Sequence, residues 1–164
     1  VNAESASFLL DLLVALVDHG HTKIQLLISS PGGYVNDGLS LYDRLQHMQQ
    51  EAGVEIEGRA MGSCASAAAA IILQAARHRT AYPNTRFLLH EISGGGQGKR
   101  SELEEQNREL AVLEGAVFDI LAKRLTLPRA TLRRRMRGRE WWLSADEALE
   151  IGLIDEVLRA APEG

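Results

Sequence analysis

The chain has 164 residues, of which 45% are hydrophobic and 24% are charged, and its formal net charge is −4. This length and balance predict one globular domain over residues 1–164, with a sizeable core. The net charge gives no reason to expect nucleic acid as the main partner, and no apolar run reaches the roughly 20 residues of a membrane span. Because Cys64 is the single cysteine, it cannot form an internal disulfide, and nothing points to an oxidising compartment.

Helical and extended patterns alternate through the first half of the chain. Apolar residues at helical spacing predict a first helix, and a short apolar run predicts a strand covered on both faces. This order favours an α/β fold with a mostly parallel sheet and helical crossovers. The expected elements are a helix over 5–17, a strand over 24–28, a turn over 29–33, a helix over 35–50, a strand over 54–58, a helix over 65–76, and strands over 80–82 and 87–92.

The second half begins with a glycine-rich loop and a long helix. Ser101–Glu104 has the pattern of a capping box and predicts that a helix starts there and runs to about Leu125. Its stripe of Leu110, Leu113, Val117 and Ile120 is compatible with burial between subunits. The remaining expected elements are a helix over 128–136, an extended segment over 140–143, a helix opened by a second capping box at 144–147 and ended by Gly152, and a strand over 153–158.

Two segments of small residues each follow a predicted strand. Ser30–Gly33 reads as a tight turn, or as a turn whose Gly33 N–H points at a substrate oxyanion, because ligands bind at strand carboxyl ends in such sheets. Gly62–Ala69 lets a helix start pack close to the sheet. It also places Ser63, Cys64 and Ser66 where a nucleophile could lie, and a serine there is commonly only a helix cap.

His90 ends an apolar strand and could take the proton of such a nucleophile. An isolated histidine at a strand end is usually structural. The histidines show no metal-ligand spacing with carboxylates or with Cys64, so no metal or other cofactor is expected. A base histidine also needs an acceptor for its second nitrogen. Glu140, beside two tryptophans, is a candidate that we expect to be sheltered by apolar surroundings, although it could simply pair with nearby arginines.

Two further segments allow a structural and a functional interpretation. Gly94–Gly98 lacks the Lys-Ser/Thr of a phosphate-binding loop, so it is a flexible loop or a backbone edge that pairs with an extended peptide. The arginines between Arg124 and Arg139 form a solvated or ion-paired helix face, or else a docking surface.

Taken together, these motifs resemble the Clp protease proteolytic subunit family, and the resemblance covers nearly the whole chain. It is carried by five segments, each weak alone and specific as a set. They are Ser30–Gly33 with the helix that follows, Gly62–Ala69, Tyr82–His90, Gly94–Gly98, and Trp142–Asp155.

The resemblance implies a crotonase-like α/β fold with a protruding helix–strand handle, and a serine endopeptidase that works through an acyl-enzyme. It makes Ser66 the nucleophile, His90 the base, and the N–H groups of Gly33 and Ala67 the oxyanion donors. The family's aspartate falls on Glu140, one methylene longer. The glycine-rich segment would bind substrate through Gly94, Gly95, Gly96 and Gln97.

The family also assembles as stacked heptameric rings fed with unfolded polypeptide by an ATP-driven unfoldase of the AAA+ class. We therefore expect a homo-oligomer, heptameric or tetradecameric, in the cytoplasm. The loops that gate the axial pore in this family have no counterpart before Val1, so we expect a divergent or trimmed member.

Two other functions stay open at this point. A crotonase-type hydratase or thioesterase acting on a CoA ester would need no Ser–His pair. A catalytically weak structural subunit, co-assembling with an active paralogue, is raised by Glu140 at the aspartate position. A Ser–Lys dyad is less favoured, because none of the three lysines lies near the predicted site in sequence.

Overall fold

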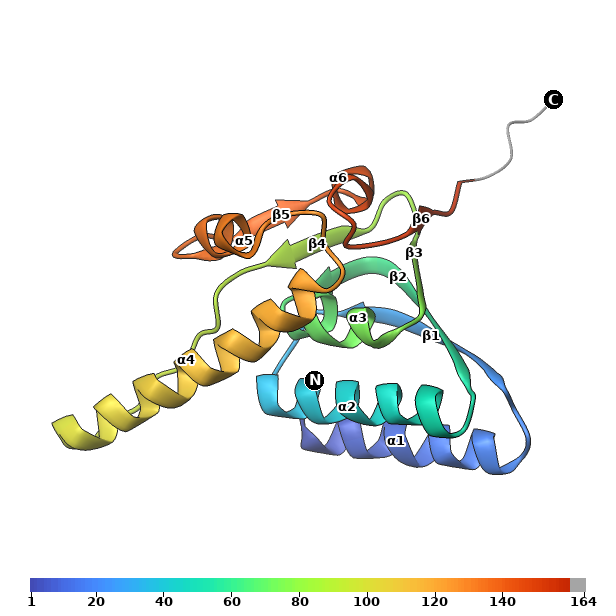
Figure 1. Cartoon of the computed structure of the whole chain (residues 1–164), viewed down its shortest axis with the longest axis horizontal. Helices are drawn as coiled ribbons and strands as arrows, with labels where there is room; N and C mark the ends of the chain where they lie inside the picture. Colours follow the sequence, from blue (N-terminus) through green and yellow to red (C-terminus); the bar gives the residue numbers. More distant parts are fainter. Residues whose placement is uncertain (160–164) are drawn as a thin grey trace.

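The computed structural model describes residues 1–159 and shows a six-stranded sheet with helices packed against it (Figure 1). The strands are β1 (Lys23–Ser30), β2 (Glu55–Ala65), β3 (His78–Ala81), β4 (Arg86–Leu89), β5 (Trp141–Leu143) and β6 (Glu156–Val157). The helices are α1 (Ala3–Asp18), α2 (Val35–Glu51), the π-helical η1 (Ala68–Ile72), α3 (Leu73–Ala75), α4 (Arg100–Ala122), α5 (Arg129–Met136) and α6 (Ala145–Glu150).

The long strand β2 organises the sheet. It pairs in parallel with β1, β3 and β4, and β3 pairs in parallel with β6. Among the strands of residues 1–159, only the β4–β5 pair is antiparallel. The expected mostly parallel α/β sheet is therefore confirmed, and the carboxyl ends of β1, β2 and β4 meet on one side, where α/β sheets bind their ligands.

The nucleophile segment differs from its sequence prediction. The strand expected over 54–58 continues to Ala65, because Cys64 pairs with Ser30 on one side and with Phe87 on the other. The helix expected over 65–76 is therefore shorter, and it begins as the π-helical turn η1. The Leu73 N–H donates to the Ala68 carbonyl, five residues back, as in a π-helix. The side-chain Nε2 of the buried Gln74 donates to the Ala69 carbonyl at 2.8 Å.

A buried arginine links β3 to the last part of the chain. Arg79 is 4% exposed, and its Nε donates to Asp155 at 2.9 Å. The same guanidinium donates to the Gln74 side chain and to the Gly152 carbonyl. Burial raises the pKa of Asp155, but hydrogen bonds and charge from Arg79 outweigh it, so the pKa lies below its usual value.

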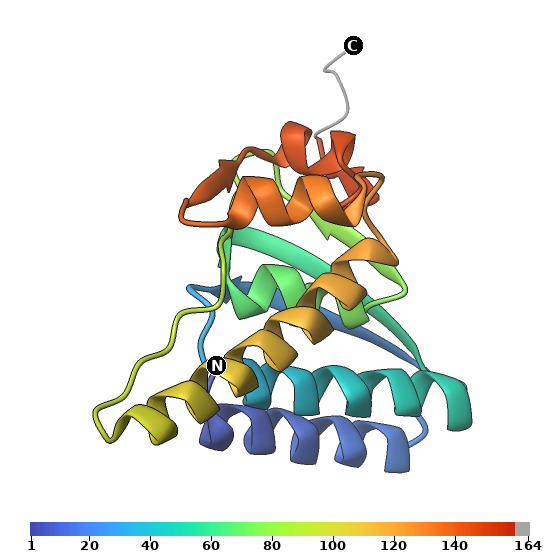
Figure 2. The ribbon, with the colours of Figure 1, turned by 60° about the vertical axis from the view of Figure 1, so that its left-hand side comes forward.

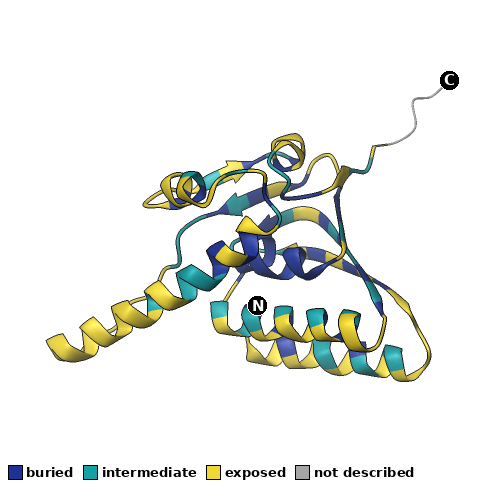
Figure 3. Cartoon of the chain, in the orientation of Figure 1, coloured by how far each residue is buried: buried dark blue, intermediate teal, exposed yellow. Residues whose placement is uncertain are grey.

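The helix α4 projects from the rest of the molecule in both ribbon views (Figures 1 and 2). Its buried residues all lie near its C-terminal end, and its outer half is exposed (Figure 3). Of the apolar stripe on this helix, Val117 and Ile120 pack into this chain's own core. The helix begins at Arg100, one residue earlier than predicted, and the Lys99 N–H donates to the Glu102 carboxylate at 2.8 Å.

The glycine-rich segment beside α4 forms no regular strand. It does lie very close to the helix: a Cβ on Gly96 would come within 2.2 Å of the Gln106 side chain, and one on Gly94 within 2.7 Å of Leu110. Among residues 1–159, no helix is long and apolar enough to cross a membrane.

Candidate active site

Ser66 lies at the turn where β2 ends and η1 begins. Its φ of 54° is the one positive value among the non-glycine residues that the structure describes. The backbone is held there from both sides: the Ser66 N–H donates to the Leu88 carbonyl at 2.8 Å, and the Ser66 carbonyl accepts from the Ala70 N–H at 2.9 Å. Such strained positions persist only where the surroundings fix them, and they concentrate at functional sites.

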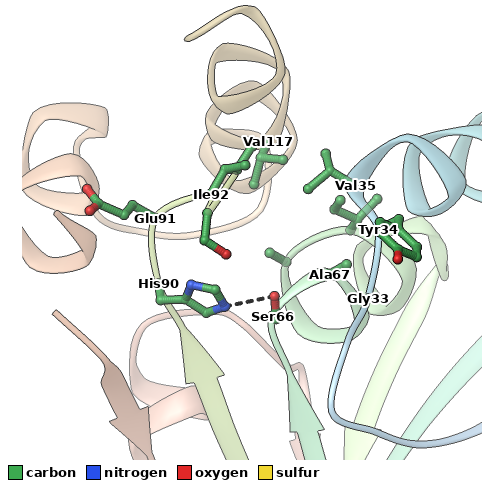
Figure 4. Close-up of a pocket in the computed structure, with 12 residues that line it drawn as sticks. Gly33, Tyr34, Val35, Ser66, Ala67, His90, Glu91, Ile92 and Val117 are labelled. Carbon is green, nitrogen blue, oxygen red and sulfur yellow. Dashed lines mark hydrogen bonds between the residues drawn. The ribbon is translucent and has the colours of Figure 1, made fainter. Parts of the chain in front are cut away.

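His90 follows the end of β4, the strand beside β2. Its Nε2 lies 2.8 Å from the Ser66 Oγ, and Figure 4 shows the imidazole edge turned toward the hydroxyl. A distance of 2.8 Å is that of a formed hydrogen bond between a nucleophile and its base. Two side chains separated by 24 positions in sequence are thus brought together by the parallel pairing of β2 with β4.

Two backbone N–H groups lie beside this pair with no acceptor. Gly33 and Ala67 line the same cleft as Ser66 and His90, and within residues 1–159 neither donates a hydrogen bond to the protein. The turn that carries Gly33 can lie this close to Ser66 because residue 32 is a glycine: a Cβ on Gly32 would lie 2.5 Å from the Ser66 Cβ. Its φ of 101° is also one that side chains rarely adopt. Unpaired N–H groups next to a nucleophile are the elements of an oxyanion hole.

The cleft has a volume of about 300 Å³ and is mostly apolar. Val35 and Ile92 stand on opposite sides of it in Figure 4, and Val117 of α4 closes its far end. The Glu91 side chain points away from the Ser66–His90 pair. Val35, Ile92 and Val117 were not predicted as cleft residues from the sequence. Val35 and Ile92 could have been predicted, because they lie two residues from the candidates Gly33 and His90 in sequence. Nothing in the sequence pointed to Val117.

The other two nucleophile candidates do not meet the histidine. Cys64 is completely buried between its strand neighbours, and burial raises the pKa of its thiol to about 12, so the thiol stays protonated. Ser63 lies on β2 before the turn and does not line the cleft. Of the three competing residues, only Ser66 is hydrogen-bonded to His90.

Glu140 lies just before β5, and its surroundings differ from expectation. The side chain is exposed rather than sheltered, because β5 is the edge strand of the sheet. Its carboxylate accepts a hydrogen bond from the Trp142 indole at 3.1 Å. Within the described chain no hydrogen bond joins Glu140 to His90. The structure therefore brings Ser66 and His90 into contact, whereas Glu140 is bonded to Trp142.

The two segments of uncertain meaning lie outside the cleft. Gly94 and Gly95 line a separate hollow against α4. Two of the arginines on α5 pair with acidic residues of α4, Arg129 with Asp119 and Arg133 with Glu114. Across residues 1–159, no three His, Cys, Asp or Glu side chains gather in a way that could hold a metal ion.

Comparison with known proteins agrees with this geometry. A family model described as Clp protease matches residues 1–161. The chain belongs to the Clp protease family. It is also 34% identical over 159 residues to a protein of Rhizobium etli named ATP-dependent Clp protease proteolytic subunit 3, and the match covers 96% of this chain and 79% of that protein.

Membership of the Clp protease family makes this chain a serine-type peptidase with the family's α/β fold. The resemblance read from the sequence motifs is thereby confirmed. The family assignment and the hydrogen bond between Ser66 and His90 both point to a serine hydrolase.

Proposed function

We propose that this protein cleaves peptide bonds within polypeptides through an acyl-enzyme formed on Ser66. The 2.8 Å contact between the Ser66 Oγ and the His90 Nε2 carries the proposal. In the first step the proton of Ser66 passes to His90 while the Oγ bonds to the substrate carbonyl carbon. The negative charge that develops on the carbonyl oxygen is stabilised by the free N–H groups of Gly33 and Ala67.

Collapse of this tetrahedral intermediate breaks the peptide bond. His90 returns its proton to the leaving amine, and the acyl group stays on Ser66. A water molecule then repeats the sequence: His90 takes its proton, its oxygen attacks the ester, and Ser66 recovers the proton on release. Glu140, whose carboxylate is bonded to Trp142 in the structure, would orient His90 during both steps once it accepts from the second ring nitrogen. The apolar cleft holds the side chain next to the scissile bond.

Substrate would bind as an extended strand. Gly94, Gly95, Gly96 and Gln97 follow directly from the cleft residue Ser93, and an edge without bulky side chains pairs with many sequences through main-chain hydrogen bonds. Gly94 and Gly96 also pack so closely on α4 that a Cβ at either position would require a side chain of the helix to move. This packing determines the path of the backbone edge that would bind substrate.

We further propose that the protein acts as a ring-forming, cytoplasmic proteolytic subunit supplied with unfolded polypeptide by an AAA+ unfoldase. The support is the name of the Rhizobium etli relative, an ATP-dependent Clp protease proteolytic subunit. The exposed outer half of α4 offers surface for contacts between copies of the chain.

One observation favours a second candidate, a catalytically weak subunit that co-assembles with an active paralogue. The exposed Glu140 is bonded to Trp142 rather than to His90, which would leave the base without its orienting acceptor. A CoA-ester enzyme is less favoured, because the Ser66–His90 hydrogen bond would have no role in it.

Labelling with a fluorophosphonate tests the proposal, with native mass spectrometry on the same samples. Wild-type protein should be labelled once, and Ser66→Ala should not be labelled at all. Ser63→Ala is the matched control and should label as the wild type does. Label on Ser63, or equal labelling of Ser66→Ala, would contradict the proposal. Assembled protein that leaves Ser66 unlabelled would favour the weak subunit.

A further inference from the structure

The β4–β5 ladder fixes which residues face His90. Three antiparallel pairs form it: Phe87 with Leu143, Leu88 with Trp142, and Leu89 with Trp141. Each step forward along β4 is a step backward along β5, so continuing this register one residue beyond its last pair brings Glu140 opposite His90. Directly opposed residues in such a ladder have their Cβ atoms about 5 Å apart, within reach of a carboxylate.

Side-chain alternation places a third residue next to this pair. Residues two apart in a strand point to the same face, so Leu88 and His90 share a face with Trp142 and Glu140. This face is the more open one, since Phe87, Leu89 and Leu143 on the other face are buried. The Trp142 indole is the neighbour that reaches Glu140, and its Nε1–H donates to the Oε2 at 3.1 Å.

We propose that Trp142 is a positioning residue for the catalytic base, acting through Glu140. The inference rests on the proposed function, in which Glu140 orients His90. A glutamate has one more rotatable bond than an aspartate, so its carboxylate is less well fixed. The indole N–H restricts that freedom by binding Oε2. The other oxygen, Oε1, is then left to accept from the His90 ring nitrogen that does not face Ser66.

The exposure and position of the Trp142 indole fit this role. Trp142 is 44% exposed, so its ring contributes less to the core than a buried tryptophan would. It lies on an edge strand, where its N–H can turn toward Glu140. The adjacent Trp141 lies on the opposite face, and the Arg135 guanidinium lies 5.0 Å from the centre of its ring. The two neighbouring tryptophans therefore provide a matched pair for an experiment.

Turnover of a fluorogenic peptide by Trp142→Phe tests the inference, with labelling of Ser66 by a fluorophosphonate as a second measurement. Loss of one hydrogen bond should lower both kcat and the labelling rate about three- to tenfold, with KM unchanged. Trp141→Phe, the control, should keep the wild-type kcat. In the Glu140→Ala background, Trp142→Phe should have no further effect, because the acceptor that it positions is gone.

Three outcomes would overturn the role of Trp142. They are an unchanged kcat in Trp142→Phe, an increased kcat, and the same loss in the Glu140→Ala background as in the wild type. An increase would mean that the indole holds Glu140 away from His90. Failure of the proposed function looks different, because the wild-type Ser66 would then not react with the fluorophosphonate.

Discussion

The turn around Ser66 and the outer half of α4 differ sharply in how their neighbours hold them. Ser66 is fixed by hydrogen bonds on both sides, and the alanines that follow it are buried. The outer half of α4 is exposed, and the helix is anchored by buried residues at its other end only. Chemistry that needs sub-ångström placement is thus built where packing leaves no freedom, and the projecting helix is left to make other contacts.

The largest expected effect is at the nucleophile itself. Ser66→Ala should lower peptide turnover by about a thousandfold or more, because the acyl-enzyme can no longer form. The melting temperature should change little, since a single small and half-buried hydroxyl is removed. Turnover assays and circular dichroism measure the two quantities, and turnover that survives the substitution would contradict the assignment.

A substitution at Gly32 tests how tightly the turn is packed. The added Cβ of Gly32→Ala would lie 2.5 Å from the Ser66 Cβ and 2.8 Å from the Ala65 carbonyl oxygen. Turnover should fall about a hundredfold, because Ser66 is displaced, and the free energy of unfolding should fall by about 2–4 kcal/mol.

Gly20→Ala is the control for this substitution. Gly20 also has a positive φ, 85°, but a Cβ there would have nothing within 4 Å. Gly20→Ala should therefore lower the free energy of unfolding by about 1 kcal/mol, the cost of the unfavourable φ alone, and turnover should stay normal. Urea denaturation distinguishes the two variants, and equal losses in both would contradict the steric explanation.

Two substitutions along α4 compare how much its buried C-terminal end and its exposed outer half contribute to stability. Phe118 is 1% exposed, and Phe118→Ala should lower the free energy of unfolding by about 3–4 kcal/mol through the cavity it leaves. Val112 is 64% exposed, and Val112→Ala should change it by less than about 0.5 kcal/mol. Both values come from urea denaturation of the unassembled subunit. A large effect of Val112→Ala under those conditions would mean that the outer half is packed within the subunit.

The Arg79–Asp155 pair should give a smaller effect, and one that depends on pH. Asp155→Asn leaves the buried guanidinium without its charge partner, which should lower the free energy of unfolding by about 2 kcal/mol at pH 7. The exposed Asp119→Asn, which loses only the pair with Arg129, should lower it by less than about 1 kcal/mol.

The sign of the pH dependence follows from the lowered pKa of Asp155. A carboxyl with a lower pKa in the folded state stabilises the fold above its unfolded pKa, about 3.9. That contribution is lost as the pH falls through the folded pKa. The difference between wild type and Asp155→Asn should therefore be full at neutral pH and shrink below about pH 4. A constant difference down to pH 2 would contradict this explanation.

Much of the fold could be predicted from local patterns. The helices over α1 and α2 follow from apolar spacing, and α6 follows from its Ser144–Glu147 capping box, which the structure confirms. The end of β2 could not be predicted, because the strand is extended by pairing with β1 and β4 at once. The alanines after Ser66 favour a helix and do form the helical turns η1 and α3, so the sequence prediction was wrong only before Ser66, where residues up to Ala65 join the strand.

The amino-acid sequence by itself determined which residue types stand at the strand ends, and so identified Ser66, His90 and the glycines as candidates for acyl transfer. Only the tertiary structure decided among the three nucleophiles, because hydrogen bonding to His90 and burial of Cys64 depend on which strands are neighbours. It also decided the surroundings of Glu140, since the side chain is exposed because β5 lies at the edge of the sheet, a place that only the strand order determines. Local patterns encode the elements, whereas contacts between distant positions arise only when the sheet has formed.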